Sequence, residues 1–397
     1  MKIALINICD YGSTGKIMLS LAREAAAAGN ETVSFTRNWW NNSGTEGNNY
    51  FGYKAEHALH HVLGYLTGRE GEFSYLSTRS LIRKLDEFGP DVIHLHNLHG
   101  WYICLPMLFD YIREKNIRVI WTLHDCWSFT GHCPYFDFCG CDRWRERCGN
   151  CPQYKGYPES LIDNSSMMLI KKKKWFSGVN DMTVACPSEW LAGLARQSFL
   201  NEYQIKVIRN GIDTSVFHKT ESLFREVNGI NENEKIVLGV ASVWEARKGL
   251  DVFSEIDSRL PDGYRIVLVG VDDDQMRSLP EDIICIKRTA NQKELAGIYS
   301  TANVFVNPTR EDNYPTVNLE AISCGTPVVT FDTGGSPESV GEGCGIVVPK
   351  NDIDAIMRAV VTICEDGKDR SEALSAMAAG FDSNIMTSEY MRLYGVS

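Results

Sequence analysis

The chain has 397 residues, of which 44% are apolar and 23% are charged, and these proportions are ordinary for a globular protein. This length predicts two or three domains with ample core. The formal net charge of −11 argues against nucleic acid as a partner. No apolar stretch approaches the length of a membrane span, and the apolar run near the start is too short for a secretory signal, so we expect a cytoplasmic protein.

Short apolar runs alternate with helical patterns along the chain. Runs that are apolar throughout are typical of strands buried on both faces, so this alternation predicts parallel sheets built from βαβ units. In the first half we expect strands at 2–8, 31–36, 91–97, 117–123 and 182–186. In the second half we expect strands at 205–208, 235–241, 264–270, 283–287, 302–307, 327–331 and 345–348. The clearest helical patterns lie at 16–28, 78–88, 104–115, 291–300 and 352–365.

The number of expected strands exceeds what one compact sheet holds, and a polar, turn-rich segment at 208–217 separates the two halves. We therefore predict an α/β fold of two doubly wound, Rossmann-like domains, with ligand bound at the carboxyl ends of the strands in the cleft between them. The predicted domains are residues 1–205 and 206–376. Residues 377–397 are expected to form helices that return to the first domain.

The loop YGSTGK at 11–16 follows the first expected strand and opens the first helix. It is not a Walker A loop, because Asp10 stands where that motif needs glycine, and it is not a dinucleotide fingerprint. Gly12 and Gly15 would let the backbone approach a ligand, and the helix N-terminus behind them favours anions. An ordinary tight turn explains the same residues equally well.

A basic pair, Arg247 and Lys248, precedes a glycine and a helix just after the strand expected at 235–241. Lysine is a compact charge suited to a diphosphate, and arginine can bind one through two parallel hydrogen bonds. Taken alone, such a pair is more often exposed to solvent.

Two carboxylates, Asp312 and Glu320, bracket the start of a short helix that Pro315 and Gly325 delimit. The first amides of this helix would stabilise a leaving diphosphate, and Glu320 could accept hydrogen bonds from both hydroxyls of a ribose. Asp312 could bind hydroxyls of a transferred sugar. The residues that we expect at this helix start are Tyr314, Pro315, Thr316 and Val317.

The stretch PTREDNYPTVNLEAISCGTPVVTFDTGGSPE resembles the acid-x7-acid segment of retaining GT-B glycosyltransferases, those grouped as family 4. The resemblance covers most of the chain. VWEARKGL resembles the Arg/Lys phosphate site of this family, VIRNGIDTSVF its interdomain segment, and CPSEWLA the segment before it. TLHDCWSFTGHC resembles a bacterial branch that makes exopolysaccharides and O-antigens, including colanic-acid-type transferases.

The resemblance implies a role for each matching residue. Glu320 would bind the ribose, Asp312 the donor sugar and Lys248 the diphosphate. His124 would face the sugar from the first domain, although a histidine at a strand end is also compatible with simple core packing. The nucleobase would lie against the backbone near Thr289.

Two departures from the family pattern affect these roles. Most relatives carry glutamate where this chain has Asp312, so either the shorter side chain alters the donor geometry or the adjacent Glu311 takes part. The wider family has arginine where this chain has Ser242. Arg247 is our candidate for the missing charge.

The resemblance implies transfer of a hexosyl unit, with retention, from a nucleotide-sugar to a saccharide or lipid-linked saccharide in cell-surface polysaccharide biosynthesis. No metal cofactor is required for this chemistry in this fold. Two alternatives are a sugar-nucleotide epimerase of the same fold and a noncatalytic binding subunit. The basic run IKKKKWF at 170–176 is either the solvated end of a helix or a contact with the anionic inner membrane surface.

The segment 131–155 holds five of the thirteen cysteines. A C-x2-C pair with further cysteines upstream suits tetrahedral zinc. We predict a structural zinc site with Cys139 as the spare thiol; the alternative is reduced, unliganded cysteines that pack an irregular insertion. The predicted ligands are Cys133, Cys141, Cys148 and Cys151.

Overall fold

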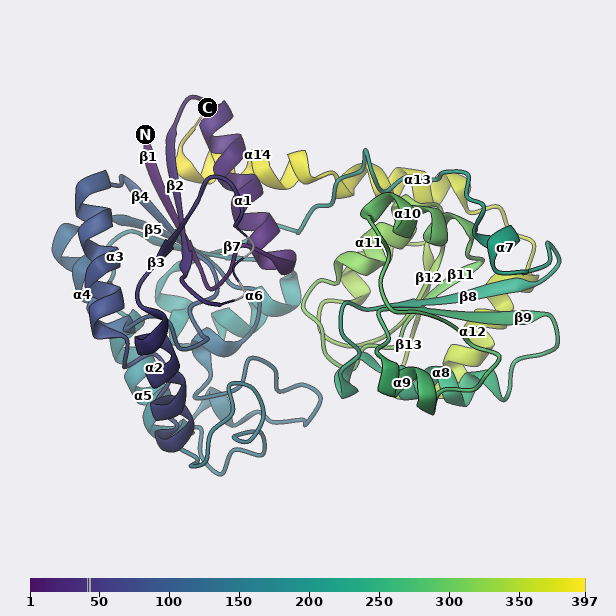
Figure 1. Ribbon diagram of the computed structural model, residues 1–397, viewed down its shortest axis with the longest axis horizontal. Coiled ribbons are helices and arrows are strands. Elements are labelled where there is room, and N and C mark those ends of the chain that lie inside the picture. Colours follow the sequence, from purple (N-terminus) through teal and green to yellow (C-terminus); the bar gives the residue numbers. More distant parts are fainter. Residues whose placement is uncertain (41, 43, 397) are drawn as a thin grey trace. The chain divides into compact units, whose positions relative to one another are not determined.

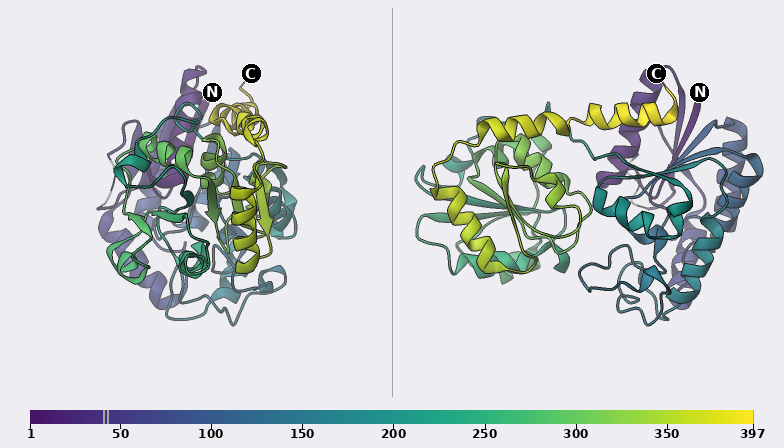
Figure 2. Two further views of the ribbon diagram at one scale, coloured as in Figure 1. Left: turned by 90° about the vertical axis from the view of Figure 1, so that its right-hand side faces the viewer. Right: turned by 180° about the vertical axis from the view of Figure 1, so that it is seen from behind.

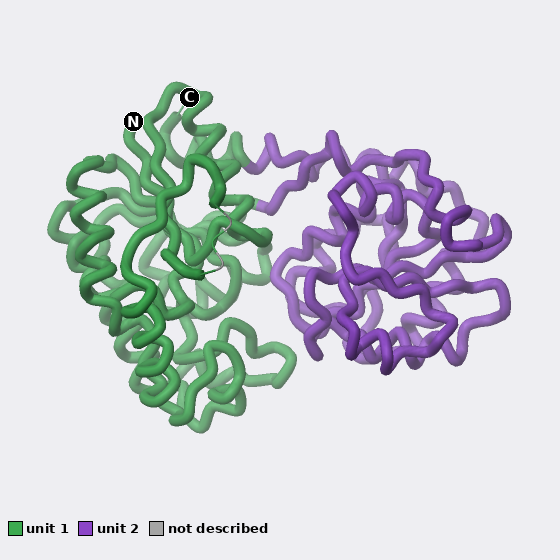
Figure 3. Tube along the Cα trace, in the orientation of Figure 1, with its two compact units in different colours: residues 1–208, 387–397 green, residues 209–386 purple. Residues whose placement is uncertain are grey.

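The computed structural model describes residues 1–40, 42 and 44–396. The chain forms two compact units, one of residues 1–208 with 387–397 and one of residues 209–386 (Figure 3). Each unit is built around one parallel sheet, so the α/β fold of two doubly wound domains is confirmed.

The first unit contains the strands β1 (Lys2–Asn7), β2 (Glu31–Arg37), β3 (Asn48–Phe51), β4 (Val92–Leu95), β5 (Arg118–Thr122), β6 (Met182–Cys186) and β7 (Gln204–Val207). Its α-helices are α1 (Gly12–Ala27), α2 (Lys54–Thr67), α3 (Tyr75–Phe88), α4 (Leu105–Lys115), α5 (Ser165–Phe176), α6 (Glu189–Arg196) and most of α14 (Ser383–Tyr394). Its 3-10 helices are η1 (Trp127–Phe129), η2 (Arg143–Arg145) and η3 (Phe199–Glu202).

Within the described ranges, the strands of the first sheet follow the order β3-β2-β1-β4-β5-β6-β7, and all neighbours are parallel. Helices α1 and α14 cover one face of this sheet, and α3 and α4 cover the other (Figure 1). The strand order reverses between β1 and β4. Ligands of doubly wound sheets bind at the carboxyl ends of the strands at such a switch point.

The second unit contains the strands β8 (Lys235–Val240), β9 (Tyr264–Val269), β10 (Ile284–Ile286), β11 (Val304–Asn307), β12 (Val328–Phe331) and β13 (Gly345–Val348). Its α-helices are α7 (Phe224–Val227), α8 (Leu250–Asp257), α9 (Asp273–Ser278), α10 (Gln292–Thr301), α11 (Thr316–Ser323), α12 (Ile353–Glu365) and α13 (Ser371–Ala378). Its 3-10 helices are η4 (Ala246–Lys248), η5 (Pro337–Ser339) and η6 (Ala379–Phe381).

The second sheet has the order β10-β9-β8-β11-β12-β13, again parallel throughout its described strands. Its two faces carry separate apolar cores. Side chains of α10, α11 and α13 form one core, and side chains of α8 and α12 form the other. The strand order reverses between β8 and β11, so the loops that follow these two strands meet at the switch point.

Most expected strands and helices are present, but one strand was assigned to the wrong half. The run expected at 205–208 forms β7, which pairs with β6 at the edge of the first sheet. An apolar pattern predicts a strand but not the sheet that it joins, so this prediction was wrong. The chain passes between the units after Ile208, whereas the predicted boundary followed residue 205 and would cut β7. The short, polar strand β3 was not predicted at all.

The basic run at 170–176 lies on α5 and is not simply a solvated helix end. Lys172 is 1% exposed, and its Nζ donates a hydrogen bond of 2.7 Å to the carbonyl of Trp127. The same ammonium lies 3.3 Å from the centre of the Trp127 ring. Lys173 and Lys174 are exposed. None of the helices in the described part of the chain is long and apolar enough to cross a bilayer.

Most of the last helix, α14, belongs to the first unit. Figure 2 shows α13 and α14 running in succession, and α14 reaches the first sheet. There Tyr390 and Tyr394 are buried, and their hydroxyls contact Thr122 at 2.8 Å and His94 at 2.6 Å.

Candidate functional site

An ion pair marks the switch point of the second sheet. Lys248, in η4 after β8, places its Nζ 2.6 Å from Oδ2 of Asp312, in the loop after β11. Both side chains keep partial exposure, 21% for Lys248 and 15% for Asp312. The two predicted residues are therefore brought together, and each can also reach a ligand at the carboxyl edge of the sheet.

Glycines allow the loops around this pair to pack closely. Gly249 has φ +78°, and a Cβ there would lie 2.4 Å from the carbonyl oxygen of Pro308. Gly334, in the loop after β12, has φ +56°, and its Cβ would lie 1.9 Å from the carbonyl oxygen of Asp312. Side chains are excluded at both positions, since contacts this short do not occur. The loops after β8, β11 and β12 thus fix the backbone that carries Asp312.

Arg247 and Glu311 also meet, but through the backbone of Glu311. Nη1 of Arg247 donates to the carbonyl oxygen of Glu311 at 3.1 Å, and its Nε donates to Glu245 at 2.8 Å. The side chain of Glu311 is buried at 3% exposure. Asp312 is thus the more accessible of the two adjacent acids.

Glu320 lies on α11 and is half-buried. The hydroxyl of Tyr299, on α10, donates a hydrogen bond of 3.2 Å to Oε2 of Glu320. Burial, and after it the Glu320 carboxylate, raise the pKa of Tyr299 well above 10, so the phenol remains a hydrogen-bond donor at neutral pH. Glu320 is oriented by this contact, which is the arrangement expected of a carboxylate that receives ligand hydroxyls.

The predicted helix start is present at α11, where Pro315 is the N-cap residue and no side chain caps the described end of the helix. Its first amides are therefore left to backbone groups or to a ligand. Tyr314 and Pro315 are buried, whereas Thr316 and Val317 are half-buried. An uncapped N-terminus of this kind favours a negatively charged group.

A buried polar network that the sequence did not reveal holds α11 in place. Asn318 is fully buried and accepts a hydrogen bond of 2.8 Å from Asn307 at the end of β11. Its own amide donates to Ser339 at 2.8 Å and to Ser336 at 3.3 Å. Satisfied networks of this kind specify one arrangement of a core. Here the network fixes α11, and with it Glu320, against β11 and η5.

Thr289, the predicted nucleobase contact, follows the edge strand β10 and is half-buried. It belongs to the carboxyl edge of the same sheet as the loops above. No hydrogen bond in the described part of the chain joins it to Lys248, Asp312 or Glu320.

In the first unit, Gly12 and Gly15 lie at the switch point of the first sheet. Gly12 begins α1 with φ +68°, and a Cβ on Gly15 would lie 2.6 Å from the backbone of Asp10. Both glycines are thus required by the turn itself. Asp10 is buried and accepts a hydrogen bond of 2.5 Å from Tyr50.

His124 is the last member of a row of histidines. His94 on β4 stacks on His96 at 4.2 Å between ring centres, and His96 stacks on His124 at 5.3 Å. Nδ1 of His96 lies 3.0 Å from Nε2 of His124. Burial lowers the pKa of His124 to about 4, so its ring is neutral at pH 7 and offers a donor and an acceptor. His94 was not singled out in the sequence, although its spacing from His96 places both on one face of a strand.

A small cavity lies beside His124, at the carboxyl ends of β4 and β5. Its wall includes His96, His99, His124 and Asp125. Nε2 of His99 lies 2.9 Å from Oδ2 of Asp125. Burial opposes charge on His99, but the charge and hydrogen bond of Asp125 outweigh it and raise the pKa of His99. The cavity therefore presents a hydrogen-bonded His99–Asp125 pair and the neutral imidazole of His124, which together offer donors and acceptors to a polar molecule.

Four of the five clustered cysteines line one cavity, and the predicted spare lies outside it. The cavity wall includes Cys133, Cys141, Cys148 and Cys151. Cys139 is exposed, and its sulfur accepts a hydrogen bond of 2.7 Å from Gln153. Among the described residues, no His, Cys, Asp and Glu side chains stand in a geometry that could hold a metal ion.

Comparison with known families defines the class of this protein. A model described as Glycosyltransferase Family 4 matches residues 14–216, more than half of the chain, and one described as Glycosyl transferases group 1 matches residues 234–366. Together with two doubly wound sheets, these matches define a glycosyltransferase of the GT-B type. The chain belongs to the family that the longer model describes.

Relatives and solved structures agree with this class. The chain is 23% identical over 325 residues to WcaC of Escherichia coli (strain K12), named as a colanic acid biosynthesis glycosyl transferase, covering 77% of this chain and 76% of that protein. The fold of this chain is similar to that of sucrose-phosphate synthase from Thermosynechococcus elongatus, with a TM-score of 0.73 and 20% identity. The match covers 99% of this chain and 98% of that chain. The fold is also similar to that of HepE from Anabaena in complex with UDP-glucose, with a TM-score of 0.68, 15% identity and full coverage of both chains.

Proposed function

We propose that this glycosyltransferase belongs to the retaining family 4 branch and moves a hexosyl unit from a nucleotide-sugar to a saccharide or lipid-linked saccharide in cell-surface polysaccharide biosynthesis. The observation that carries this proposal is the Lys248–Asp312 pair at the switch point of the second sheet. The relationship to WcaC supports the pathway class, and the similarity to HepE with UDP-glucose supports the donor class.

Each donor group has a matching element in the second unit. Glu320, oriented by Tyr299, would accept hydrogen bonds from the ribose hydroxyls. The ammonium of Lys248 and the uncapped start of α11 would face the diphosphate. Asp312, held against Lys248, would bind hydroxyls of the donor sugar.

The proposed reaction breaks the bond between C1 of the sugar and the diphosphate oxygen, and it forms a bond between C1 and an acceptor oxygen on the same face. The leaving oxygen takes the proton of the acceptor hydroxyl, so no protein base is needed. Negative charge grows on the diphosphate as the bond breaks. Fixed positive groups aimed at that charge are usually the largest electrostatic contribution to such a rate. Lys248 is the residue that we assign to this role.

The first unit would supply the acceptor side. Neutral His124 and the hydrogen-bonded pair of His99 and Asp125 give its cavity both donors and acceptors for hydroxyl groups. A saccharide acceptor fits this polar lining better than an apolar molecule does.

An apolar and basic face of the first unit supports a lipid-linked acceptor. Helices α2 and α5 expose apolar side chains outward, and α5 adds exposed lysines beside them. The end of α2 lies beside the segment before α5, because the Leu161 amide donates to the carbonyl of Tyr65 at 2.7 Å and the Asn164 side chain donates to the carbonyl of Thr67 at 3.0 Å. We propose that this face contacts an anionic lipid surface, since basic groups beside apolar ones favour that environment. The face consists of Leu59, Val62, Leu66, Met167, Ile170, Lys173 and Lys174.

The decisive experiment combines donor binding with product analysis. Purified protein is screened by thermal shift against UDP, GDP, ADP and their sugars, because a bound nucleotide raises the melting temperature. The sugar-nucleotide that binds is then offered with and without saccharide acceptors, and the anomeric configuration of any product is determined by NMR. We expect transfer with retention only when an acceptor is present.

A matched pair of variants ties the activity to the site. Glu320→Ala should abolish donor binding and transfer, whereas Glu342→Ala, at an exposed glutamate in the same unit, should leave both unchanged. Turnover of the sugar-nucleotide without an acceptor would indicate an epimerase instead. Full activity in Glu320→Ala would remove the assignment of this residue.

A further inference from the structure

The cysteine-rich segment between η1 and α5 is long and has little secondary structure of its own. Apart from η2, no helix or strand is present in the described residues 130–164. Long irregular segments inside compact domains need some other source of order. A small aromatic cluster supplies part of it, since Trp144 packs against Phe129 at 5.2 Å and Phe136 at 5.3 Å between ring centres.

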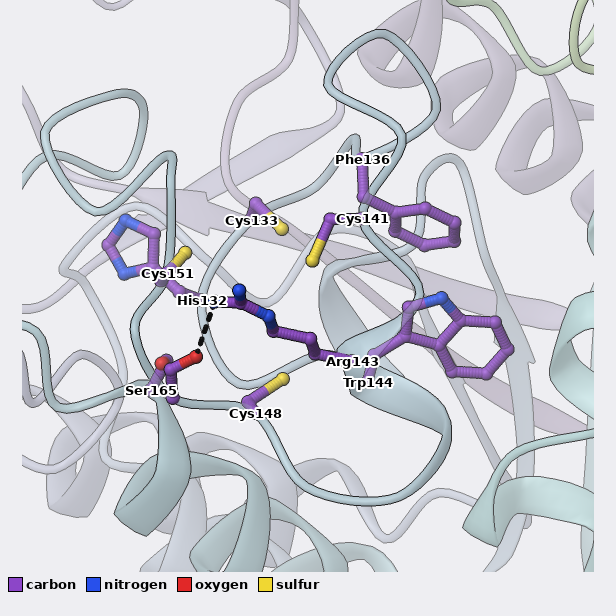
Figure 4. A pocket seen from close by; sticks show the side chains of 10 residues that line it. His132, Cys133, Phe136, Cys141, Arg143, Trp144, Cys148, Cys151 and Ser165 are labelled. Carbon is purple, nitrogen blue, oxygen red and sulfur yellow. Dashed lines mark hydrogen bonds between the residues drawn. The ribbon is translucent and has the colours of Figure 1, made fainter.

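Beside this aromatic cluster, four cysteine side chains surround one small cavity. Figure 4 shows the sulfur atoms of Cys133, Cys141 and Cys148 turned toward the same space, with Cys151 at its side. The cavity volume is about 10 Å³, which is room for a single atom-sized guest. The four residues come from separate stretches of the segment, so their convergence is a tertiary feature and not a consequence of one local motif.

Two hydrogen-bond donors, the amide of Gly131 and the guanidinium of Arg143, lie close to the cysteine side chains of the cavity. The amide of Gly131 donates a hydrogen bond of 3.3 Å to Sγ of Cys148. A Cβ on Gly131 would lie 2.1 Å from the carbonyl oxygen of Ser165, so only glycine allows this approach. The guanidinium of Arg143 extends among the cysteine side chains in Figure 4, and its Nη1 donates to the carbonyl of Gly149 at 3.1 Å. Amide donors and a nearby cation are the outer groups that tune thiolate metal sites.

We propose that Cys133, Cys141, Cys148 and Cys151 bind one structural zinc ion. Zinc prefers four ligands in a tetrahedron, and thiolates at about 2.3 Å are its usual partners in closed structural sites. Binding converts four thiols to thiolates and releases their protons to solvent, which leaves a centre of charge −2 beside Arg143. The sulfurs do not stand at coordination geometry in the structure, so the side chains must turn inward when the ion binds.

The site would brace the loop that carries His124 and Asp125. The amide of Cys126 donates to the carbonyl of Pro134 at 2.8 Å, and Oγ1 of Thr130 donates to the carbonyl of Cys133 at 2.6 Å. These bonds tie the start of the segment to η1 and to Cys126, which follows directly after Asp125. A zinc ion bound by the cysteines would therefore hold in place one wall of the other cavity, the one beside His124. Only this consequence rests on the proposed function, because zinc binding itself does not require activity.

The test measures metal content and stability in the full-length protein. Protein purified without chelator should contain one zinc ion per chain by mass spectrometry of the metal, and removal of zinc should lower its melting temperature. Cobalt(II) added to the zinc-free protein should give the absorption bands of a tetrahedral thiolate site. Cys148→Ser should lose the metal, whereas Cys139→Ser, at the exposed spare thiol, should keep it.

Three results would overturn the proposal. The first is far less than one zinc per chain in wild-type protein that is folded and unaffected by chelation. The second is full metal retention in a variant that combines Cys148→Ser with Cys133→Ser. The third is an intact mass that lies two hydrogens below the value for the reduced protein, together with a peptide map that locates a disulfide between Cys133 and Cys151. The wild-type measurements decide the question even where a variant fails to fold.

Discussion

The ammonium of Lys248 and the carboxylate of Asp312 lie 2.6 Å apart although 64 residues separate them in the chain. They meet because β8 and β11 are neighbours at the point where the strand order of the second sheet reverses. An ion pair with partial exposure contributes little to stability, at most about 1 kcal/mol. Its position at the carboxyl edge therefore matters more for the proposed donor binding than for the fold.

Replacement of Lys248 should affect the reaction far more than the fold. We expect Lys248→Ala to lower the transfer rate on the order of 100- to 1000-fold, because it removes a positive charge aimed at the leaving diphosphate. Lys248→Arg should retain part of the rate. Steady-state kinetics and thermal melting of the same samples check this prediction, and an unchanged rate with Lys248→Ala would contradict it.

The close approach of Gly334 to Asp312 can be tested with two alanine variants. Gly334→Ala introduces a Cβ 1.9 Å from the carbonyl oxygen of Asp312 and must displace that loop. Gly367→Ala is the matched control, since Gly367 has a similar φ of +62° but no atom within 4 Å of its Cβ. We expect loss of donor affinity and stability with the first variant and only the cost of positive φ, about 1 kcal/mol, with the second. Equal effects in both would show that the close contact is unimportant.

The network around Asn318 should contribute more to the free energy of unfolding than a surface asparagine does. Asn318→Ala removes the acceptor of the buried Asn307 amide as well as the hydrogen bond to Ser339, and a buried group left unsatisfied costs about 1–3 kcal/mol. The free energy of unfolding of the second unit, measured in urea, should fall by that amount. Asn201→Ala, at an exposed position of the first unit, is the control and should change it by less than about 0.5 kcal/mol.

The histidine row predicts a loss of stability in mild acid. Burial lowers the folded-state pKa of His124 from 6.5 to about 4 and that of His94 to about 3. As the pH falls below 6.5, the unfolded chain binds protons that the folded chain excludes. The contribution of each histidine is therefore complete above pH 6.5 and is lost toward its folded-state pKa, by up to about 1.4 kcal/mol per pH unit.

Urea unfolding at several values between pH 7.5 and 4.5 measures this effect. His124→Asn should make the stability of the first unit less steeply dependent on pH, whereas His218→Asn, at an exposed histidine of the second unit, should leave the slope unchanged. A slope that is the same in wild type and His124→Asn would refute the assignment of a neutral ring to His124.

The proposed lipid-facing surface can be tested directly by measuring binding to lipid vesicles. Ile170 is 67% exposed on α5, and Ile170→Asp adds a negative charge among the lysines of that face. We expect this variant to sediment less with vesicles of anionic lipid than wild type does, with the difference greatest at low salt. Val227→Asp is the control, because Val227 is 79% exposed but lies in the second unit. Equal binding of all three proteins would exclude this face as the contact.

Local patterns predicted most of the strands and helices but not how distant residues meet. The apolar runs of β1, β8 and β11 stand out in the sequence because strands buried on both faces need apolar side chains throughout. Strand order has no local signature, so neither the Lys248–Asp312 contact nor the place of β7 could be derived. A similar limit applies to Asn318, whose importance depends on partners at three separate positions. The convergence of four cysteines was predicted from their spacing, although metal binding there remains a proposal.

The last helix determines which fragments of this protein can be produced in a folded form. Tyr390 and Tyr394 of α14 complete the core beside Thr122 and His94, which lie in strands near the beginning of the chain. A fragment that stops at residue 208 would leave that apolar surface exposed and remove both hydroxyl partners. The first unit could be produced alone only if residues 383–396 were rejoined to it, for example through a linker to Met1 in a permuted chain. An affinity tag fused directly after α14 should likewise leave Tyr394 free to pack, since this residue is part of a folded core.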